Sequence, residues 1–210
     1  QVFLMEALWT RFLPTTLKTL ELIESGAIGE VVSLKADFGF QAAYKPEGRL
    51  FNPDLGGGAL LDIGIYPIFL AYLLMGKPDE IDAVSNFHPN GTEVQTSMIF
   101  QYHKSQAVLY SGISSNSKME AEISGSEGTL FLQPRWHEAS AYTIEKKGAR
   151  ETVELPIQGI GFVYEIEHVH HCLRKQLLES PLWSHQHSLD LVELMDTIRQ
   201  KAGIKFPFEA

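Results

Sequence analysis

A series of short strand-like segments fills the middle of the chain and constrains its fold more than any other feature. The segments are rich in β-branched and aromatic residues, and they cover residues 80–88, 93–103, 107–115, 119–124, 128–132, 141–146 and 152–155. Asn90-Gly91, between the first two segments, favours a tight β-hairpin. Because short turns join consecutive segments, the pattern predicts a mostly antiparallel sheet.

Helical patterns lie before and after this block of strands. The sequence predicts a helix from Pro14 to a stop at Ser25-Gly26, a strand at 30–40, a buried helix at 59–75, and helices at 162–179 and 187–202. This order predicts an α+β fold, a mostly antiparallel open sheet with helices packed on one face. Apolar residues occur at both parities of the strands, so we expect a second copy of the chain to cover the other face, which predicts a homo-oligomer.

Composition and charge exclude several classes of partner. The net charge is −9 and the basic residues are scattered, which argues against nucleic acid as the main partner. Asp62, Gly64 and Pro67 interrupt the longest apolar stretch, so we expect no membrane span. Cys172 is the only cysteine and permits no intrachain disulfide, which fits a cytoplasmic location.

The most informative motif runs from Gly56 to Tyr66. Three consecutive glycines, the last of them Gly58, let a ligand or a backbone segment approach closely. Asp62 and Tyr66 lie four residues apart, so one helical face would carry a carboxylate and a phenol able to hold a substrate hydroxyl and move its proton. Alternatively, Asp62 caps the helix and Tyr66 belongs to the core. A free tyrosine has a pKa near 10, so proton transfer needs a nearby cation, and no lysine lies close in sequence.

A second candidate segment runs from Glu6 to Pro14, where a predicted short buried strand over residues 2–7 ends. Ligand contacts are common at such strand ends. Trp9 could stack on a ligand ring and Arg11 could meet a phosphate. The alternative is that Trp9 is a core residue and Arg11 a surface ion-pair residue.

Histidines gather near the end of the chain, at positions 168, 170, 171, 185 and 187. His168 and His171 have the spacing of zinc ligands on a helix. However, the sequence contains no His-Glu-x-x-His motif and no pair of cysteines. We therefore predict no metal site and assign these histidines to polar surfaces or interdomain contacts.

Several motifs in a fixed order resemble the C-terminal domain of the glucose–fructose oxidoreductase / inositol dehydrogenase (Gfo/Idh/MocA) family. The resemblance rests on segments 6–14, 56–66, 123–130, 162–165, 172–175 and 179–181. Within the family, the Trp9-Thr10-Arg11-Phe12 run and Tyr66 are similar to the branch that oxidises trans-dihydrodiols and D-xylose. The resemblance covers the chain from end to end.

This resemblance implies a nicotinamide-dependent dehydrogenase whose nucleotide-binding Rossmann domain is absent from the chain. It implies that residues 1–13 are the last strand and exit of that domain, and that 14–210 form the substrate-binding and dimerisation domain. NADP or NAD would be bound mainly by the absent part, whose lysine would supply the cation for Tyr66. Hydride would pass between nicotinamide and a hydroxyl of a sugar or trans-dihydrodiol. We expect the chain alone to be inactive.

The same resemblance implies roles for individual residues. Tyr66 would be the acid/base group and Asp62 would orient the substrate or the tyrosine. Trp9 would line the substrate and nicotinamide sites, and Arg11 would contact the cofactor. Tyr164 and Gly58 would border the substrate. The open sheet face would form the interface of a dimer.

Three other interpretations of the sequence stay open. The first is a non-catalytic ligand-sensing or structural relative with the same fold, which the retention of both Asp62 and Tyr66 argues against. The second is a zinc-dependent hydrolase that uses the histidines. The third is a module that assembles with other proteins.

Overall fold

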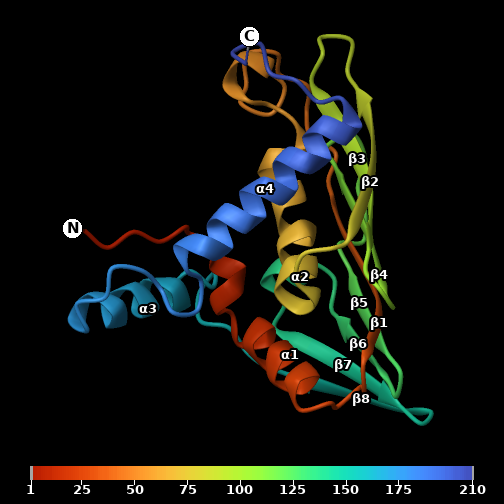
Figure 1. The fold of residues 1–210 in the computed structure, drawn as a ribbon, viewed down its shortest axis with the longest axis vertical. Coiled ribbons are helices and arrows are strands. Elements are labelled where there is room, and N and C mark those ends of the chain that lie inside the picture. Colours follow the sequence, from red (N-terminus) through yellow and green to blue (C-terminus); the bar gives the residue numbers. More distant parts are fainter. Residues whose placement is uncertain (1, 210) are drawn as a thin grey trace.

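A single eight-stranded sheet forms the framework of the computed structural model, which describes residues 2–209 (Figure 1). The strands are β1 (Val31–Gly39), β2 (Glu80–Phe87), β3 (Glu93–Gln101), β4 (Gln106–Gly112), β5 (Ala121–Gly125), β6 (Thr129–Leu132), β7 (Ala141–Lys146) and β8 (Ala149–Glu154). The α-helices are α1 (Pro14–Glu24), α2 (Ile65–Met75), α3 (Val163–Arg174) and α4 (His185–Ala202). Short 3-10 turns are η1 (Trp9–Phe12), η2 (Pro53–Leu55) and η4 (Trp136–Glu138), and η3 (Leu60–Gly64) is a π-helical turn.

The sheet order is β2-β3-β4-β1-β5-β6-β7-β8. Its strands pair antiparallel except for β1 and β4, which run parallel, so the prediction of a mostly antiparallel sheet is confirmed. The earliest strand in the sequence therefore lies in the middle of the sheet. Leu34 of β1 pairs with Ala107 of β4 on one side and with Ile123 of β5 on the other, and all three side chains are buried.

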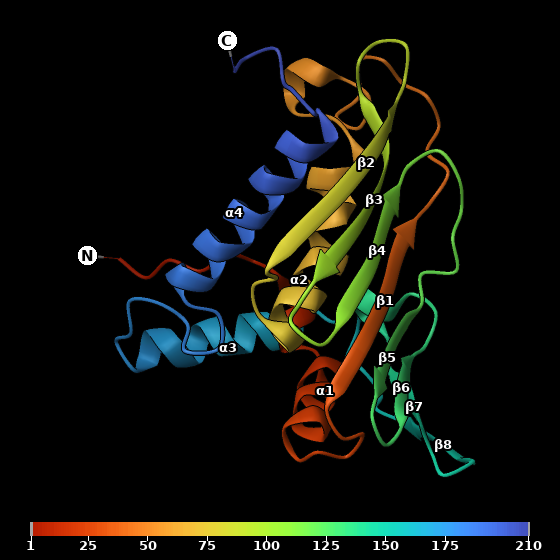
Figure 2. The ribbon, with the colours of Figure 1, turned by 45° about the vertical axis from the view of Figure 1, so that its right-hand side comes forward.

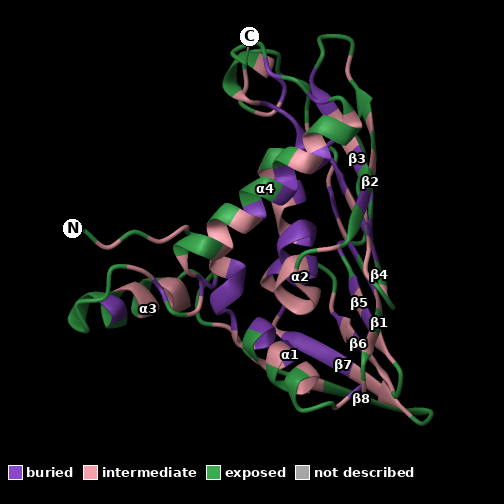
Figure 3. Cartoon of the chain, in the orientation of Figure 1, coloured by how far each residue is buried: buried purple, intermediate pink, exposed green. Residues whose placement is uncertain are grey.

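Helices α1, α2 and α4 cover one face of the sheet, as the sequence predicted (Figures 1 and 2). Figure 3 shows the buried residues concentrated between this helical layer and the sheet. Val84, Ile99 and Val108 point the other way and are exposed, since no helix among the described residues packs on the opposite face. The expected covering of this face by a second copy stays a prediction.

Local sequence explains where the helices begin and end. Pro14 opens α1, where its missing N–H costs no hydrogen bond. Ser184 caps α4, and Gly203 ends it in the left-handed conformation. Helix α2 is apolar on all sides because it lies between α4 and the sheet, and Ile68 and Phe69 are fully buried. No helix among residues 2–209 is long and apolar enough to cross a bilayer.

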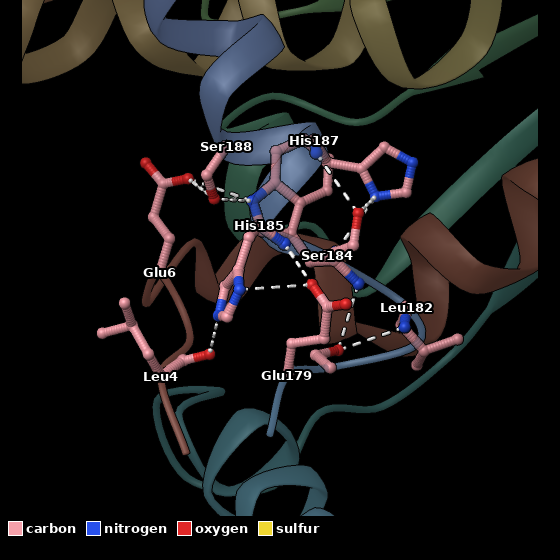
Figure 4. Close-up of polar contacts among 10 residues, drawn as sticks. Leu4, Glu6, Glu179, Leu182, Ser184, His185, His187 and Ser188 are labelled. Atoms are coloured by element: carbon pink, nitrogen blue, oxygen red, sulfur yellow. Dashed lines mark hydrogen bonds and ion pairs between the residues drawn. The ribbon is translucent and has the colours of Figure 1, made fainter. Parts of the chain in front are cut away.

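The predicted buried strand at residues 2–7 is wrong. This segment has no strand structure, and Val2 and Leu4 are exposed. A strand needs a neighbouring strand to satisfy its backbone groups, and the sheet of the described residues offers none here. The segment is held instead by hydrogen bonds: Glu6 Oε2 accepts one from Ser188 Oγ at 2.6 Å (Figure 4). It also accepts one from Trp183 Nε1 at 3.0 Å.

Candidate active site

Tyr66 and Trp9 meet at the centre of an aromatic cluster. Tyr66 lies in the first turn of α2 and Trp9 in η1, and Trp9 Nε1 donates a hydrogen bond to Tyr66 Oη at 3.1 Å. The ring of Phe38 at the end of β1 lies 5.4 Å from that of Tyr66, and the ring of Phe162 lies 4.9 Å from that of Trp9. The fold thus brings together Tyr66 and Trp9, which lie far apart in sequence, while their roles in a site stay predictions.

His137 completes this cluster, although no sequence motif pointed to it. Its ring stacks on Phe38 at 4.1 Å and lies 5.5 Å from the ring of Tyr66. The side chain is 4% exposed, and its Nδ1 atom is buried without a hydrogen-bond partner among the described residues. Burial lowers the pKa of His137 to about 4, so the imidazole is neutral at neutral pH.

The environment of Tyr66 keeps its phenol protonated. Burial is the main cause that raises the pKa of Tyr66, and the hydrogen bond from Trp9 opposes it. The charged groups of the described residues that act on Tyr66 are acids, namely Asp62, Glu165 and Glu138, and they raise the pKa further. Tyr66 can therefore hold and donate a proton, and it needs an added cation before it can accept one.

Asp62 lies on the π-helical turn that precedes Tyr66, and its partner is Arg49. Arg49 Nη1 lies 2.5 Å from Asp62 Oδ1. The two side chains predicted to share one helical face thus have separate partners, and they interact through charge. Arg49 belongs to the loop between β1 and η2, so this loop holds Asp62, a contact that sequence spacing did not indicate.

Gly58 adopts φ +143°, a conformation that side chains disfavour. A Cβ atom at this position would lie 2.9 Å from Oε2 of Glu93, which begins β3. The close approach expected at the glycine run is therefore to a buried side chain of the sheet. Sequence spacing could not indicate Glu93, because it lies far along the chain from Gly58.

Arg11 makes a hydrogen bond to a distant part of the chain, and Tyr164 makes a local one. Arg11 is 7% exposed and its Nε donates to the carbonyl oxygen of Leu182 at 3.0 Å. The predicted surface alternative for Arg11 is therefore wrong, since the side chain is buried. Tyr164 Oη accepts a hydrogen bond from the backbone N–H of Gln158 at 3.0 Å and closes the turn before α3.

The histidines near the end of the chain act separately. His187 and Ser184 form the capping box of α4, and His185 lies 3.0 Å from the carbonyl oxygen of Leu4 and 3.5 Å from Glu179 (Figure 4). His168 Nε2 lies 2.8 Å from Ser180 Oγ. Residues 2–209 contain no group of three or more His, Cys, Asp or Glu side chains that could hold a metal ion.

Comparison with known proteins shows that the chain is similar to one family of oxidoreductases. The family model described as the GFO/IDH/MocA C-terminal domain matches residues 16–131. The trans-1,2-dihydrobenzene-1,2-diol dehydrogenase of Xenopus tropicalis is 36% identical over 218 residues, and the human enzyme of the same name is 32% identical over 221 residues. Both alignments cover 98% of this chain but only 64% of the relative.

Solved structures of two oxidoreductases have the same fold as this chain. The 3-ketoreductase KijD10 from Actinomadura kijaniata, in complex with NADP and TDP-benzene, superposes with a TM-score of 0.82 at 27% identity over 95% of this chain and 62% of the other. The aldose–aldose oxidoreductase from Caulobacter crescentus, in complex with glycerol, has the same fold, with a TM-score of 0.82 at 23% identity over 93% of this chain and 60% of the other.

Proposed function

Because the chain belongs to the GFO/IDH/MocA family, we propose that it forms the substrate site of an NAD(P)-dependent dehydrogenase. The substrate hydroxyl would belong to a sugar or a trans-dihydrodiol, a proposal supported by the names of the relatives. The chain spans 64% of the length of its curated relatives, so we assign the nucleotide-binding part to sequence outside residues 1–210. In this division, residues 1–13 lead out of that part and 14–210 bind substrate.

The observation that carries the proposal is the half-buried phenol of Tyr66, bonded to Trp9 and close to the rings of Phe38 and His137. The phenol is protonated at neutral pH and can therefore donate its proton to a carbonyl oxygen in the direction of reduction. In the direction of oxidation it must accept the hydroxyl proton, which requires a cation. We assign that cation to a lysine of the nucleotide-binding part, as the family resemblance implies.

The residues of this chain fit a nicotinamide ring better than they fit a whole dinucleotide. The aromatic rings of Trp9 and Phe162 offer an apolar wall beside Tyr66, whereas the sequence has no Gly-x-Gly-x-x-Gly motif to hold a pyrophosphate. NADP or NAD supplies the hydride chemistry when bound. Trp9 would orient the nicotinamide, and Arg11, buried against Leu182, would support the turn that carries Trp9.

The remaining site residues receive positioning roles. Asp62, held by Arg49, would orient the substrate hydroxyl, and Gly58 would let the start of the helix lie close to the sheet. Tyr164 would shape the wall of the substrate pocket by fixing the turn before Phe162. A non-catalytic relative with the same fold is the alternative function, and the protonated phenol beside Asp62 favours the enzyme.

We also propose that the chain forms a homo-oligomer through the open face of the sheet. Val84, Ile99 and Val108 lie exposed on this face and would be covered by a second copy. The scattered basic residues and the single, buried Cys172 support a small-molecule enzyme of the cytoplasm, with no nucleic-acid or membrane partner. Light scattering of wild type and Val108→Glu tests the interface, because only the variant should dissociate.

The function is tested on the complete product of the gene that encodes this chain. NADP and NAD reduction is followed with D-xylose, other aldoses, inositol and a trans-dihydrodiol. Tyr66→Phe should lower kcat by about 10²- to 10⁴-fold, the range for loss of a general acid or base. Tyr102→Phe is the matched control, because among residues 2–209 its hydroxyl bonds only the carbonyl oxygen of Gly76.

Each outcome has a distinct meaning. Turnover that is lost in Tyr66→Phe but kept in Tyr102→Phe supports the proposed function. Turnover that survives Tyr66→Phe keeps the dehydrogenase but refutes the acid/base role. Binding of cofactor without turnover on any of these substrates favours the non-catalytic alternative.

A further inference from the structure

We infer that Glu93 is a positioning residue that fixes the start of the helix bearing Asp62 and Tyr66, an inference that rests on the proposed function. Glu93 begins β3, on the sheet, whereas the helix start lies after the long loop that follows β1. Its carboxylate is one point at which the sheet holds this helix start by a hydrogen bond. Nothing in the spacing of the sequence joins the two.

Both carboxylate oxygens of Glu93 accept hydrogen bonds from buried groups. The residue is 2% exposed, and its Oε2 accepts the backbone N–H of Leu60 at 2.8 Å. Its Oε1 accepts a hydrogen bond from Thr96 Oγ1 at 2.6 Å, and Thr96 is itself fully buried. An isolated parallel bridge joins the backbones of Gly58 and Glu93. Both oxygens of the carboxylate are thus committed, one to the sheet and one to the helix start.

These contacts explain the glycine run. A Cβ atom at Gly57 would lie 2.7 Å from the carbonyl oxygen of Asn52, and one at Gly58 would lie 2.9 Å from Glu93 Oε2. The chain therefore passes between the loop and Glu93 with no room for side chains. The first N–H groups of a helix have no partner within the helix, and here the Glu93 carboxylate takes the N–H of Leu60.

The hydrogen bond from Leu60 to Glu93 affects the site because Leu60 begins the π-helical turn that carries Asp62. Leu60 begins η3, Asp62 lies inside it and Tyr66 follows in the first turn of α2. Single π-turns recur at functional sites because their wider turn redirects the side chains that they carry. A shift of Leu60 would move Asp62 and Tyr66 together relative to Trp9, which belongs to another element.

The hydrogen bond from the N–H of Leu60 depends on an acceptor atom in the side chain at position 93 more than on a negative charge there. Burial raises the pKa of Glu93, while the hydrogen bonds from Thr96 and from the backbone of Leu60 and Ala59 oppose the rise. A glutamine has an amide oxygen that can accept the N–H of Leu60 and an N–H₂ group that can donate a hydrogen bond to Thr96 Oγ1. Thr96 Oγ1 can accept that bond because it lies 2.7 Å from Ser85 Oγ, to which it can donate its own proton. Alanine offers no acceptor at all.

The test compares Glu93→Ala, Glu93→Gln and Thr143→Ala in the complete gene product. Thr143 is a fully buried polar residue of β7, bonded to Thr152 and Gln133, and it controls for the loss of a buried hydrogen-bond network elsewhere in the sheet. Steady-state kinetics on the substrate of the wild type measure kcat and KM, and hydrogen exchange measures the protection of the amides from Leu60 to Tyr66.

Glu93→Ala should lower kcat about 100-fold, the effect of a misplacement of about 1 Å, with KM for cofactor changed less than about threefold. Glu93→Gln should restore most of that loss, and Glu93→Ala should raise exchange across residues 60–66 while Thr143→Ala does not. Equal kcat in Glu93→Ala and Thr143→Ala, or faster exchange at Leu60 alone, overturns the inference. If the wild type turns over none of the substrates, the proposed function fails and hydrogen exchange alone decides the role of Glu93.

Discussion

Replacing Gly58 by alanine should destabilise the fold more than an ordinary glycine substitution. An alanine restricts the unfolded chain and by itself stabilises by about 0.4–1 kcal/mol. Against this, the conformation at φ +143° costs an alanine about 1–3 kcal/mol. The new Cβ, 2.9 Å from Glu93 Oε2, also breaks the bond to Leu60 and leaves a buried acceptor unpaired, at about 1–3 kcal/mol. The sum predicts a loss of about 3 kcal/mol in the free energy of unfolding.

Gly148→Ala is the matched control for this prediction. Gly148 also has a positive φ, +78°, but a Cβ there would meet no atom within 4 Å. It should cost only about 1 kcal/mol, from backbone strain less the gain in the unfolded state. Urea denaturation of both variants gives the difference, and thermal unfolding should place Gly58→Ala about 10 °C below wild type. Equal losses in the two variants would refute the argument from Glu93.

Three further predictions concern the site and the helices. Asp62→Asn removes one cause that raises the pKa of Tyr66, so the basic limb of the pH profile of kcat for carbonyl reduction, where Tyr66 donates the proton, should move to lower pH; an unchanged limb would contradict this coupling. The pKa of His137 is depressed in the folded state, so its contribution to stability is present above pH 6.5 and lost as the pH falls toward 4. The free energy of unfolding of the wild type should therefore fall between pH 7 and pH 4, and His137→Phe should reduce that fall by about 3 kcal/mol. Urea denaturation at each pH measures the difference. Ser184→Ala should lower the free energy of unfolding by about 1 kcal/mol, with Ser184→Gly milder, because it removes the cap of α4; equal stability of wild type and Ser184→Ala would exclude a capping role.

The sequence predicted local structure well and the pairing of distant elements poorly. The alternation along β1 to β8 and the helix signals at Pro14 and Gly203 are local, and the structure has these elements near the expected residues. The insertion of β1 between β4 and β5 depends on contacts between distant segments, which periodicity does not encode. The segment at 2–7 shows the same limit, because an apolar run becomes a strand only beside another strand.

The candidate site follows the same division. Tyr66, Asp62 and Trp9 stood out because their residue types and motifs are chemically suggestive. His137, Arg49 and Glu93 did not, because each acquires its role only from a neighbour brought close by folding: Phe38, Asp62 and Leu60 respectively. A buried histidine followed by an acidic residue, as in the His137-Glu138 pair, carries no recognisable signal in a single sequence.

The central place of β1 bears on the order in which the chain folds. Strands β2 to β4 and strands β5 to β8 are each built from neighbours in sequence and can assemble as two local meanders, whereas β1 pairs only with β4 and β5, both distant. Contacts between distant segments form slowly because a long loop must close first. We therefore expect insertion of β1 to limit the folding rate, so that substitutions on β1 slow folding while those at the β7–β8 hairpin speed unfolding. Phe38 lies on that strand, so its contact with the ring of Tyr66 is expected to be among the last to form.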